Sequence, residues 1–346
     1  MQSRMLIGAA AFLTAAASIA APAGAQVSSQ CPASTGSTGG VPNEGTVIQD
    51  ACQKTNDIFR FLAPQLGVTI AGGNATIGVG GTIGGLGHIY VSGRANVVQS
   101  DIPEVDQVTP SVTGARSDQY PTRTQIIGIP EADVSIGILR GFPVGLTNVG
   151  GLDLLVSASY LPSFTSGAVN VSLPKGSFNF GAGARLGLIQ ETLFIPGISV
   201  TYLRRGLPTV DVVAHSGSDT LRIDNLDVTT DAVRLVVSKN LLMFGLAAGV
   251  GEDHYASRAD ASAFVASRTL GGTVVSPATS IQSVALRQSL NRTTYFVDGS
   301  LNLPFVRLIG EIGHTSGSSI STFNTFESGP AGAGRTYGAV GVRLGL

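Results

Sequence analysis

From residue 88 onward, small or apolar residues alternate with polar residues along most of the chain. In "HIYVSGRANVV", residues 88–98, Ile89 and Val91 share one face with small residues, whereas Tyr90 and Arg94 lie on the other face. A period of two places successive side chains on opposite faces of a β-strand. A run of about ten such residues is long enough to cross a bilayer as a tilted strand.

Segments of the same kind recur at 88–98, 130–142, 151–163, 177–190, 196–206, 227–239, 242–256, 290–303, 305–317 and 335–346. The connections between them alternate in length. The long ones are 99–129, 164–176, 207–226, 257–289 and 318–334, and the short ones lie near 143–150, 191–195, Asn240-Leu241 and Pro304. Outer-membrane barrels combine long extracellular loops with short periplasmic turns.

We therefore predict an all-β fold for residues 84–346: a transmembrane antiparallel up-and-down β-barrel of about ten strands. Both ends of the barrel chain would lie on the periplasmic side. Twelve strands are the alternative, if part of 99–129 also pairs within the wall. Independently of the strand number, residues 207–226 are expected to form a hairpin that extends two strands outside the membrane, with "HSGSD" as its turn.

Composition favours a membrane barrel over a soluble sandwich or β-helix. Only 12% of residues are charged and the mean hydropathy is +0.30, yet the longest apolar run of the mature chain, "LLMFGLAAGV", is too short for a membrane helix. Aromatic residues fall near both ends of the predicted strands, as interfacial girdles do. Those near the short turns are Phe142, Phe194, Phe244 and Phe305, and those near the outer ends are Tyr160, Phe164, Phe178, Tyr255 and Tyr295.

The first 25 residues have the features of a secretory signal peptide. Arg4 precedes the apolar run Leu6–Ala21, and the small residues Ala23–Ala25 form a cleavage site before Gln26. The polar stretch 26–43 is expected to be a disordered linker. In an exported protein, Cys31 and Cys52 are expected to form a disulfide, with two free thiols as the alternative.

Residues 44–83 are predicted to form a helix followed by a glycine-rich segment. Apolar residues recur at helical spacing over 46–62, and Ala63-Pro64 is expected to end the helix. The following run, "GGNATIGVGGTIGGLG", is not a nucleotide loop, because Ile83 occupies the third glycine position and no Lys lies between Lys54 and Lys175.

Our hypothesis is that residues 44–85 form a plug in or across the periplasmic mouth of the barrel. The glycine run would thread beside the bare walls formed by the inward-facing Gly181, Gly183, Gly187, Gly245, Gly249 and Gly251. The alternative is that these inward glycines simply widen a small pore.

Assigning the polar face of each strand to the interior gives a set of lumen-facing residues with mixed charges. They are His88, Tyr90, Arg94, Asp133, Asp153, Arg185, Arg234, Asp298, Arg307, Glu311 and Arg343. One interpretation is a salt-bridged filling of a narrow barrel, and the other is a polar constriction that selects solutes.

Other chemistry is not favoured by the sequence. A net charge of −1 predicts no nucleic-acid partner, and the four His residues show no metal-ligand spacing. In "GEDHY", Asp253 and His254 are adjacent and so point to opposite faces of a strand. His215 near Ser216 lacks a third group to orient it. We therefore expect no cofactor, no metal and no enzymatic activity.

The last segment, "RTYGAVGVRLGL" (Arg335–Leu346), resembles the closing strand of the single-chain outer-membrane β-barrels of Gram-negative bacteria. Strands of this kind bind the barrel-assembly machinery and usually end on an aromatic residue, whereas this one ends on Leu346. The resemblance implies an outer-membrane location in contact with lipid. We expect a narrow or plugged channel for passive passage of small solutes. A structural or surface-interaction barrel is the alternative, and an outer-membrane enzyme is the third.

Overall fold

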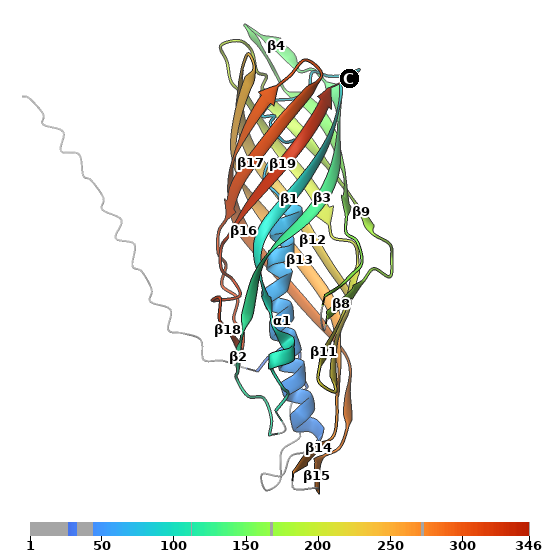
Figure 1. Ribbon diagram of the computed structural model, residues 1–346. Helices are drawn as coiled ribbons and strands as arrows, with labels where there is room; N and C mark the ends of the chain where they lie inside the picture. Colours follow the sequence, from blue (N-terminus) through green and yellow to red (C-terminus); the bar gives the residue numbers. More distant parts are fainter. Residues whose placement is uncertain (1–26, 33–43, 112, 167–168, 271–272, 346) are drawn as a thin grey trace, which may run out of the picture.

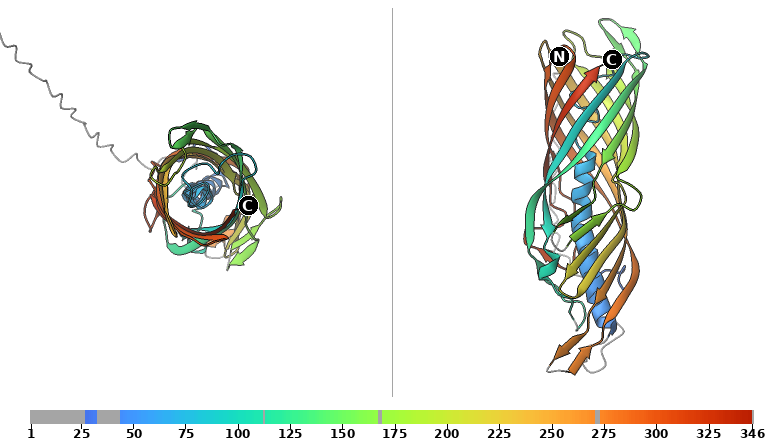
Figure 2. Two further views of the ribbon diagram at one scale, coloured as in Figure 1. Left: turned by 90° about the horizontal axis from the view of Figure 1, so that it is seen from above. Right: turned by 45° about the vertical axis from the view of Figure 1, so that its right-hand side comes forward.

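The computed structural model describes residues 27–32, 44–111, 113–166, 169–270 and 273–345. The predicted signal peptide, 1–25, and most of the predicted linker, 26–43, lie outside these residues. The described chain folds as a tall barrel that encloses one helix (Figures 1 and 2).

Ten strands form a closed antiparallel ring, as the alternation predicts. Consecutive strands of the ring pair with one another, β10 also pairs with β12, and β1 pairs with β19 to join the two ends. The ring strands are β1 (Ile89–Pro103), β3 (Thr122–Leu139), β6 (Gly151–Tyr160), β9 (Phe178–Ile189), β10 (Gly197–Gly206), β12 (Asp219–Leu241), β13 (Phe244–Val265), β16 (Thr279–Asn302), β17 (Val306–Thr315) and β19 (Arg335–Gly345). The alternative of twelve wall strands does not apply, because 99–129 contributes to the wall only by lengthening β1 and β3, and its other short strand, Gln119–Tyr120, pairs outside the ring.

The remaining elements are short. They are β2 (Gln119–Tyr120), β4 (Phe142–Val144), β5 (Thr147–Val149), β7 (Phe164–Ser166), β8 (Val169–Ser172), β11 (Val210–Ser216), β14 (Arg268–Leu270), β15 (Thr273–Ser276), β18 (Thr325–Phe326) and the 3-10 helix η2 (Val105–Gln107). β11 and β12 form the hairpin expected within 207–226, and its turn lies in "HSGSD". β8 and β7 extend the sheet from β11.

The barrel has two chemically distinct ends. The short-turn end carries the short connections near 143–150, 191–195, Asn240-Leu241 and Pro304, and the long-loop end carries the longer connections between the strands. Near the short-turn end the outer surface is an apolar belt with exposed aromatic residues, among them Phe142, Phe194, Phe244 and Phe305. Tyr160, Phe178 and Tyr295 are exposed at the other edge of the belt, as expected, whereas Tyr255 is buried inside the barrel. Beyond this edge the outward residues become charged, for example in the exposed ion pair of Arg258 with Asp227.

Three strands continue well past the belt, so the predicted loops 207–226 and 257–289 are largely sheet. β12, β13 and β16 contain 23, 22 and 24 residues, respectively. Their inward residues in this region are apolar or small, as with Ala259 and Ala261 of β13. The strands therefore have an apolar partner inside the barrel to pack against.

That partner is helix α1 (Glu44–Ala71), which is longer than predicted. Pro64 does not end it, although proline removes the hydrogen bond to the carbonyl four residues earlier. The side-chain amide of Gln288 in β16 donates to that carbonyl, Arg60 O, at 3.4 Å. The helix ends instead where Gly72 adopts a left-handed conformation, with φ of 55°. Within the described residues, no helix is long and apolar enough to cross a membrane.

Candidate functional site: the occupied lumen

Helix α1 fills the half of the barrel that projects beyond the belt. Its apolar residues form a core with the long strands and with the loop before β19, and the Phe61 ring stacks on Phe326 at 4.0 Å. Our hypothesis placed the helix at the periplasmic mouth, among the short turns. The structure places it at the opposite, long-loop end, because that is where the strands present apolar inward faces (Figure 2).

Polar contacts fix the same helix to the long loops. The Asp57 carboxylate accepts hydrogen bonds from the backbone N–H groups of Phe323 and Asn324, at 3.1 and 2.8 Å, and from the Asn324 amide at 2.7 Å. Burial raises the pKa of Asp57, while these hydrogen bonds act in the opposite direction. The expected disulfide between Cys31 and Cys52 is present and ties residues 27–32 to the helix.

Residues 72–88, which we call the glycine segment, continue from the helix through the half of the lumen that the belt surrounds. Backbone N–H groups of this segment donate to carboxylates on the wall. Gly73 and Asn74 donate to Glu311 at 2.9 and 2.8 Å, and Gly78 donates to Asp298 at 2.9 Å. The Ile83 N–H group lies 3.2 Å from Asp153. Carboxylates therefore satisfy backbone donors that would otherwise be unpaired in the interior.

Arginines of the wall bind the backbone carbonyls in the same way. Arg234 donates to the carbonyls of Gly72 and Gly73 at 2.8 and 2.9 Å. Arg94 also donates to Asn74 O at 2.7 Å and Arg343 to Ile77 O at 2.8 Å, and Arg205 donates to the carbonyl of Ala71, the last residue of α1, at 3.0 Å. Charge-assisted hydrogen bonds of this kind are stronger than neutral ones, so the segment is firmly held.

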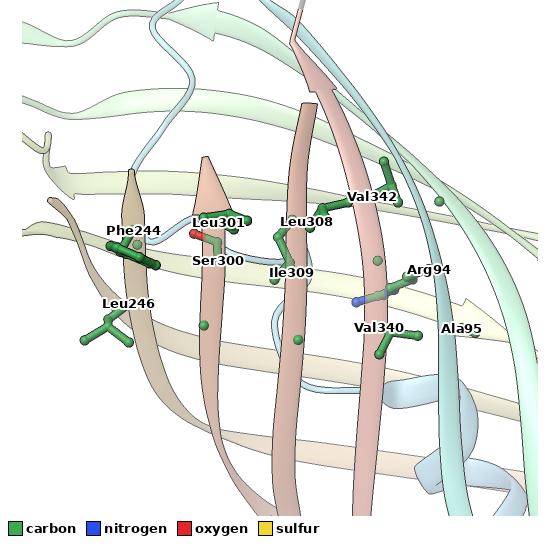
Figure 3. A pocket seen from close by; sticks show the side chains of 15 residues that line it. Arg94, Ala95, Phe244, Leu246, Ser300, Leu301, Leu308, Ile309, Val340 and Val342 are labelled. Atoms are coloured by element: carbon green, nitrogen blue, oxygen red, sulfur yellow. The ribbon is translucent and has the colours of Figure 1, made fainter. Parts of the chain in front are cut away.

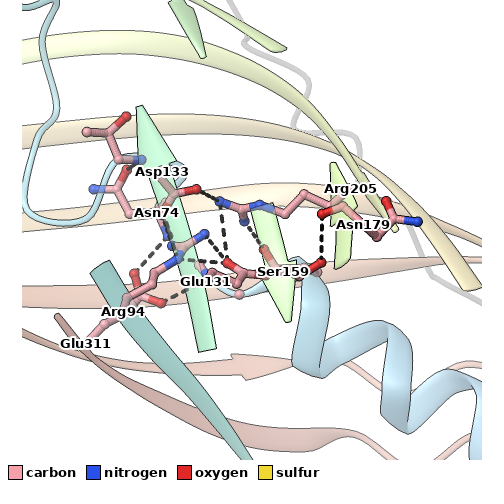
Figure 4. Close-up of polar contacts among 12 residues, drawn as sticks. Asn74, Arg94, Glu131, Asp133, Ser159, Asn179, Arg205 and Glu311 are labelled. Atoms are coloured by element: carbon pink, nitrogen blue, oxygen red, sulfur yellow. Dashed lines mark hydrogen bonds and ion pairs between the residues drawn. The ribbon is translucent and has the colours of Figure 1, made fainter. Parts of the chain in front are cut away.

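Four of the charged groups form a buried network (Figure 4). Arg94 lies 2.8 Å from Glu131 and 3.1 Å from Asp133, and Arg205 lies 3.0 Å from Asp133. Asp153 pairs with Arg185 at 2.7 Å, and Arg234 pairs with Asp253. Burying a charge is costly unless it is paired and hydrogen-bonded, and here each pair also positions a group that holds the glycine segment.

The structure brings most of the lumen-facing residues together around the glycine segment. Eight of them are buried and point inward: Arg94, Asp133, Asp153, Arg185, Arg234, Asp298, Glu311 and Arg343. Arg307 and Tyr90 are half-buried at the short-turn mouth, and His88 is exposed just before β1. His88 lies outside the lumen because β1 begins one residue later, at Ile89.

Sequence reasoning missed several residues of the same site, although the signal was present. Glu131 lies two residues before Asp133, and Asp253 lies two residues after Gly251. Because side chains two apart share a face of a strand, both residues follow from the phase already assigned. Arg205, one residue before the end of β10 at Gly206, also points into the barrel, but the sequence analysis assigns no inward residue on its segment. Asn74 carries no such signal, because it lies in an irregular segment.

The inward glycines of the wall do not form one continuous bare surface beside the glycine segment. A Cβ atom added at Gly187 would lie 2.8 Å from Thr82 of the segment, in keeping with the hypothesis. At Gly249 and Gly251 the space is already occupied by wall side chains, those of Phe296 and Arg234. The glycine segment is itself tightly fitted, since a Cβ atom on Gly80 would lie 2.5 Å from the backbone nitrogen of Ser238.

The described residues of this half of the barrel line a cavity and a surface groove. A cavity of about 380 Å³ opens at the short-turn mouth, lined by the glycine segment, Tyr90, Glu191, Asn240 and Arg307. A shallow apolar groove lies on the outer face of the belt, across β13, β16, β17, β19 and β1 (Figure 3). Phe244, Leu246, Leu301, Leu308, Val340 and Val342 line this groove, which lies where lipid chains would contact the wall.

The groups considered for catalysis lie apart. His254 points outward, where its ring contacts Asn291 and Ser289, while the adjacent Asp253 points into the barrel. His215 contacts Thr220 in the hairpin of β11 and β12. Among the described residues, no group of three or more His, Cys, Asp or Glu side chains could hold a metal ion.

The architecture is that of single-chain outer-membrane β-barrels. No family model matches the sequence, and no curated protein matches it. Among solved structures, the outer membrane protease OmpT of Escherichia coli has 10% identity over 79% of this chain and 100% of its own, with a TM-score of 0.37. The translocator domain of the autotransporter NalP of Neisseria meningitidis has 9% identity over 74% and 87%, with a TM-score of 0.35. The toluene transporter TodX of Pseudomonas putida has 11% identity over 79% and 97%, with a TM-score of 0.29. These are similarities of fold alone.

Proposed function

We propose that this protein is an outer-membrane channel for small solutes whose own N-terminal segment, residues 44–88, keeps it closed at rest. Residues 1–25 would direct export and be removed, and Arg335–Leu346 would be recognised by the barrel-assembly machinery. The function proposed is passive passage rather than catalysis. It requires that the segment inside the barrel can leave or rearrange.

The observation that carries the proposal is how the lumen is filled within the belt. A barrel that serves only as an anchor can fill its interior with its own wall side chains. Here much of the filling is a separate stretch of backbone, held by polar contacts such as Gly73 with Glu311 and Arg94 with Asn74. Water or a polar solute can donate and accept hydrogen bonds in place of such contacts, whereas neither can take the place of an apolar core.

Conductance of the refolded protein in a planar bilayer tests the proposal. We expect the full chain to be silent and a variant lacking residues 27–83 to show discrete conductance steps. A full-length variant, Gly80→Val, should flicker, because the added side chain collides with the backbone at Ser238. Gly299→Val is the matched control, since Gly299 faces outward into open space in the belt and the change should leave the barrel silent.

One observation favours the alternative, a surface-interaction barrel without transport. β12, β13 and β16 project beyond the belt and surround helix α1, which has its own apolar core. A gate alone would not need so large a structure outside the belt. Under that alternative, the variant lacking 27–83 would fold, as judged by circular dichroism, and still pass no ions. That result would set the channel proposal aside.

A further inference from the structure

The cavity at the short-turn mouth has the size and lining of a small-molecule site. Its volume of about 380 Å³ lies within the usual range for such sites. One wall is the glycine segment at Gly78–Thr82, and the other walls carry the side chains of Tyr90, Gln190, Asn240 and Arg307. The proposed channel function does not account for this cavity.

Arg307 faces this cavity without a carboxylate partner. In the pairing of β17 with β19 it lies directly opposite Arg343, and like charges in that position repel. Within the described chain, no carboxylate lies within ion-pair distance of either arginine. Arg307 makes a single long hydrogen bond, 3.4 Å to the side-chain oxygen of Asn240.

Arg343 adds a second positive charge behind the cavity wall, and it too has no ion-pair partner among the described residues. Its side chain is buried, one nitrogen donates to Ile77 O, and its guanidinium lies 5.0 Å from the centre of the Tyr90 ring. Nη2 of Arg343 has no hydrogen-bond partner among the described residues, which is unusual for a buried charged group. Two guanidinium groups therefore converge on one side of the cavity.

Glu191 is the one acidic residue among those that line the cavity in the described structure, and other groups occupy its carboxylate. It accepts hydrogen bonds from the backbone N–H of Asn240 at 2.5 Å, from the Asn240 amide at 2.8 Å and from the Ser238 hydroxyl at 3.2 Å. It thus positions Asn240 and leaves Arg307 available.

We propose that this cavity binds a small oxyanion, a carboxylate or a phosphate, through the guanidinium group of Arg307. A planar guanidinium presents parallel N–H groups that match the two oxygens of such an anion. Arg343 contributes attraction from behind Tyr90, and the Gln190 amide lies within the same lining. The site forms in the closed barrel, so binding does not depend on whether the barrel conducts.

Isothermal titration of the full chain in a zwitterionic detergent tests the site. Inorganic phosphate and succinate are titrated separately at constant ionic strength, with chloride as the background anion. We expect saturable binding of one of them at a single site, and the tighter of the two identifies the class of solute. Arg307→Gln should weaken this binding about tenfold or more, since it removes a charge-assisted contact.

Arg140→Gln is the matched control. Arg140 is exposed at the same end of the barrel and lies outside the lining of the cavity, so its loss should change the affinity less than twofold. The proposal is overturned if neither anion binds or if both arginine variants weaken binding equally.

Discussion

The two halves of the barrel hold one continuous segment by different means. In the long-loop half, helix α1 is held through its side chains: Phe61 and Ile70 are fully buried in apolar packing, and Asp57 accepts hydrogen bonds from the long loops. In the belt half, the glycine segment is fixed by charged groups that bind its backbone, as with Glu311 and Arg234. The helix satisfies its own backbone groups, so only its side chains need partners. The glycine segment has few side chains and an unpaired backbone, so the wall must supply polar partners.

The difference shows why the charges of the lumen are mixed in sign. A backbone segment presents both N–H donors and carbonyl acceptors, so carboxylates must pair with the first and arginines with the second. The buried wall residues follow this rule, since Glu311 and Asp298 bind N–H groups while Arg94 and Arg234 bind carbonyls. For the closed state, the salt-bridged filling describes these residues better than a solute-selecting constriction does.

The largest effect is expected from breaking the apolar half. Phe61→Ala removes a fully buried ring that stacks on Phe326, and it should destabilise the long-loop half by about 3–5 kcal/mol. Amide hydrogen exchange should rise over residues 55–66 while the bilayer conductance stays silent, because the glycine segment keeps its contacts. Phe244→Ala, on the exposed lipid face, is the control. Conductance steps in Phe61→Ala would show that the two halves are not independent.

Removing the disulfide should have the next largest effect on the same half. Cys31 and Cys52 are separated by 21 positions, and closing a loop of that size restricts the unfolded chain by roughly 3 kcal/mol. The double variant Cys31→Ser, Cys52→Ser should therefore show faster amide exchange at the start of α1, with the glycine segment unaffected. If amide exchange over residues 72–83 increased as much as it does in α1, the disulfide would stabilise the glycine segment as well as the helix.

The belt half is tested through one carboxylate. Asp298→Ala leaves the Gly78 N–H and the Asn74 amide without their acceptor, at a cost of about 2 kcal/mol. If the glycine segment leaves the lumen as a unit, this change raises the fraction of barrels with an open lumen about 30-fold. The open barrels would be detected as brief conductance events. Asp227→Ala, in an exposed ion pair beyond the belt, should produce none. A silent Asp298→Ala barrel with normal protection in α1 would argue that other contacts hold the segment closed.

The alternation of the sequence was sufficient to predict the barrel, because a wall between lipid and a polar lumen requires that pattern in every strand. The alternation predicts the strands less well beyond the belt, where their outer face contacts water and their inner face contacts helix α1. There β13 still alternates, but the sequence analysis assigns its residues 257–265 to a loop. The length of these strands depends on the helix that fills the barrel. The alternation within one segment does not reveal that helix.

The helix and the glycine segment show the same limit. Pro64 is a sound signal for a helix end, and only a long-range contact from Gln288 offsets it. The site was partly predictable, since the phase that gave Asp133 also gives Glu131. The binding of each charge to a particular backbone group was not, because it depends on where an irregular segment runs inside the closed ring.

The smallest effect is expected at the seam between the two halves. Asp101 of β1 joins the wall to the helix there, because its backbone exchanges hydrogen bonds with the side chain of Gln65. Burial acts to raise the pKa of the Asp101 carboxyl, but hydrogen bonds from Thr124 and Arg335 outweigh it and hold this pKa below its ordinary value. The folded state therefore favours the ionised carboxylate more than the unfolded state does.

The sign of the pH dependence follows from that lowered pKa. This stabilisation is present above the ordinary pKa that the aspartate has in the unfolded chain, and it is lost as the pH falls through the lower folded-state value. The thermal unfolding temperatures of the unmodified protein and of Asp101→Asn should therefore differ at pH 6 and approach one another as the pH falls below that folded-state value. A difference between the two proteins that does not change with pH would assign the role of Asp101 to its backbone contacts with Gln65 alone.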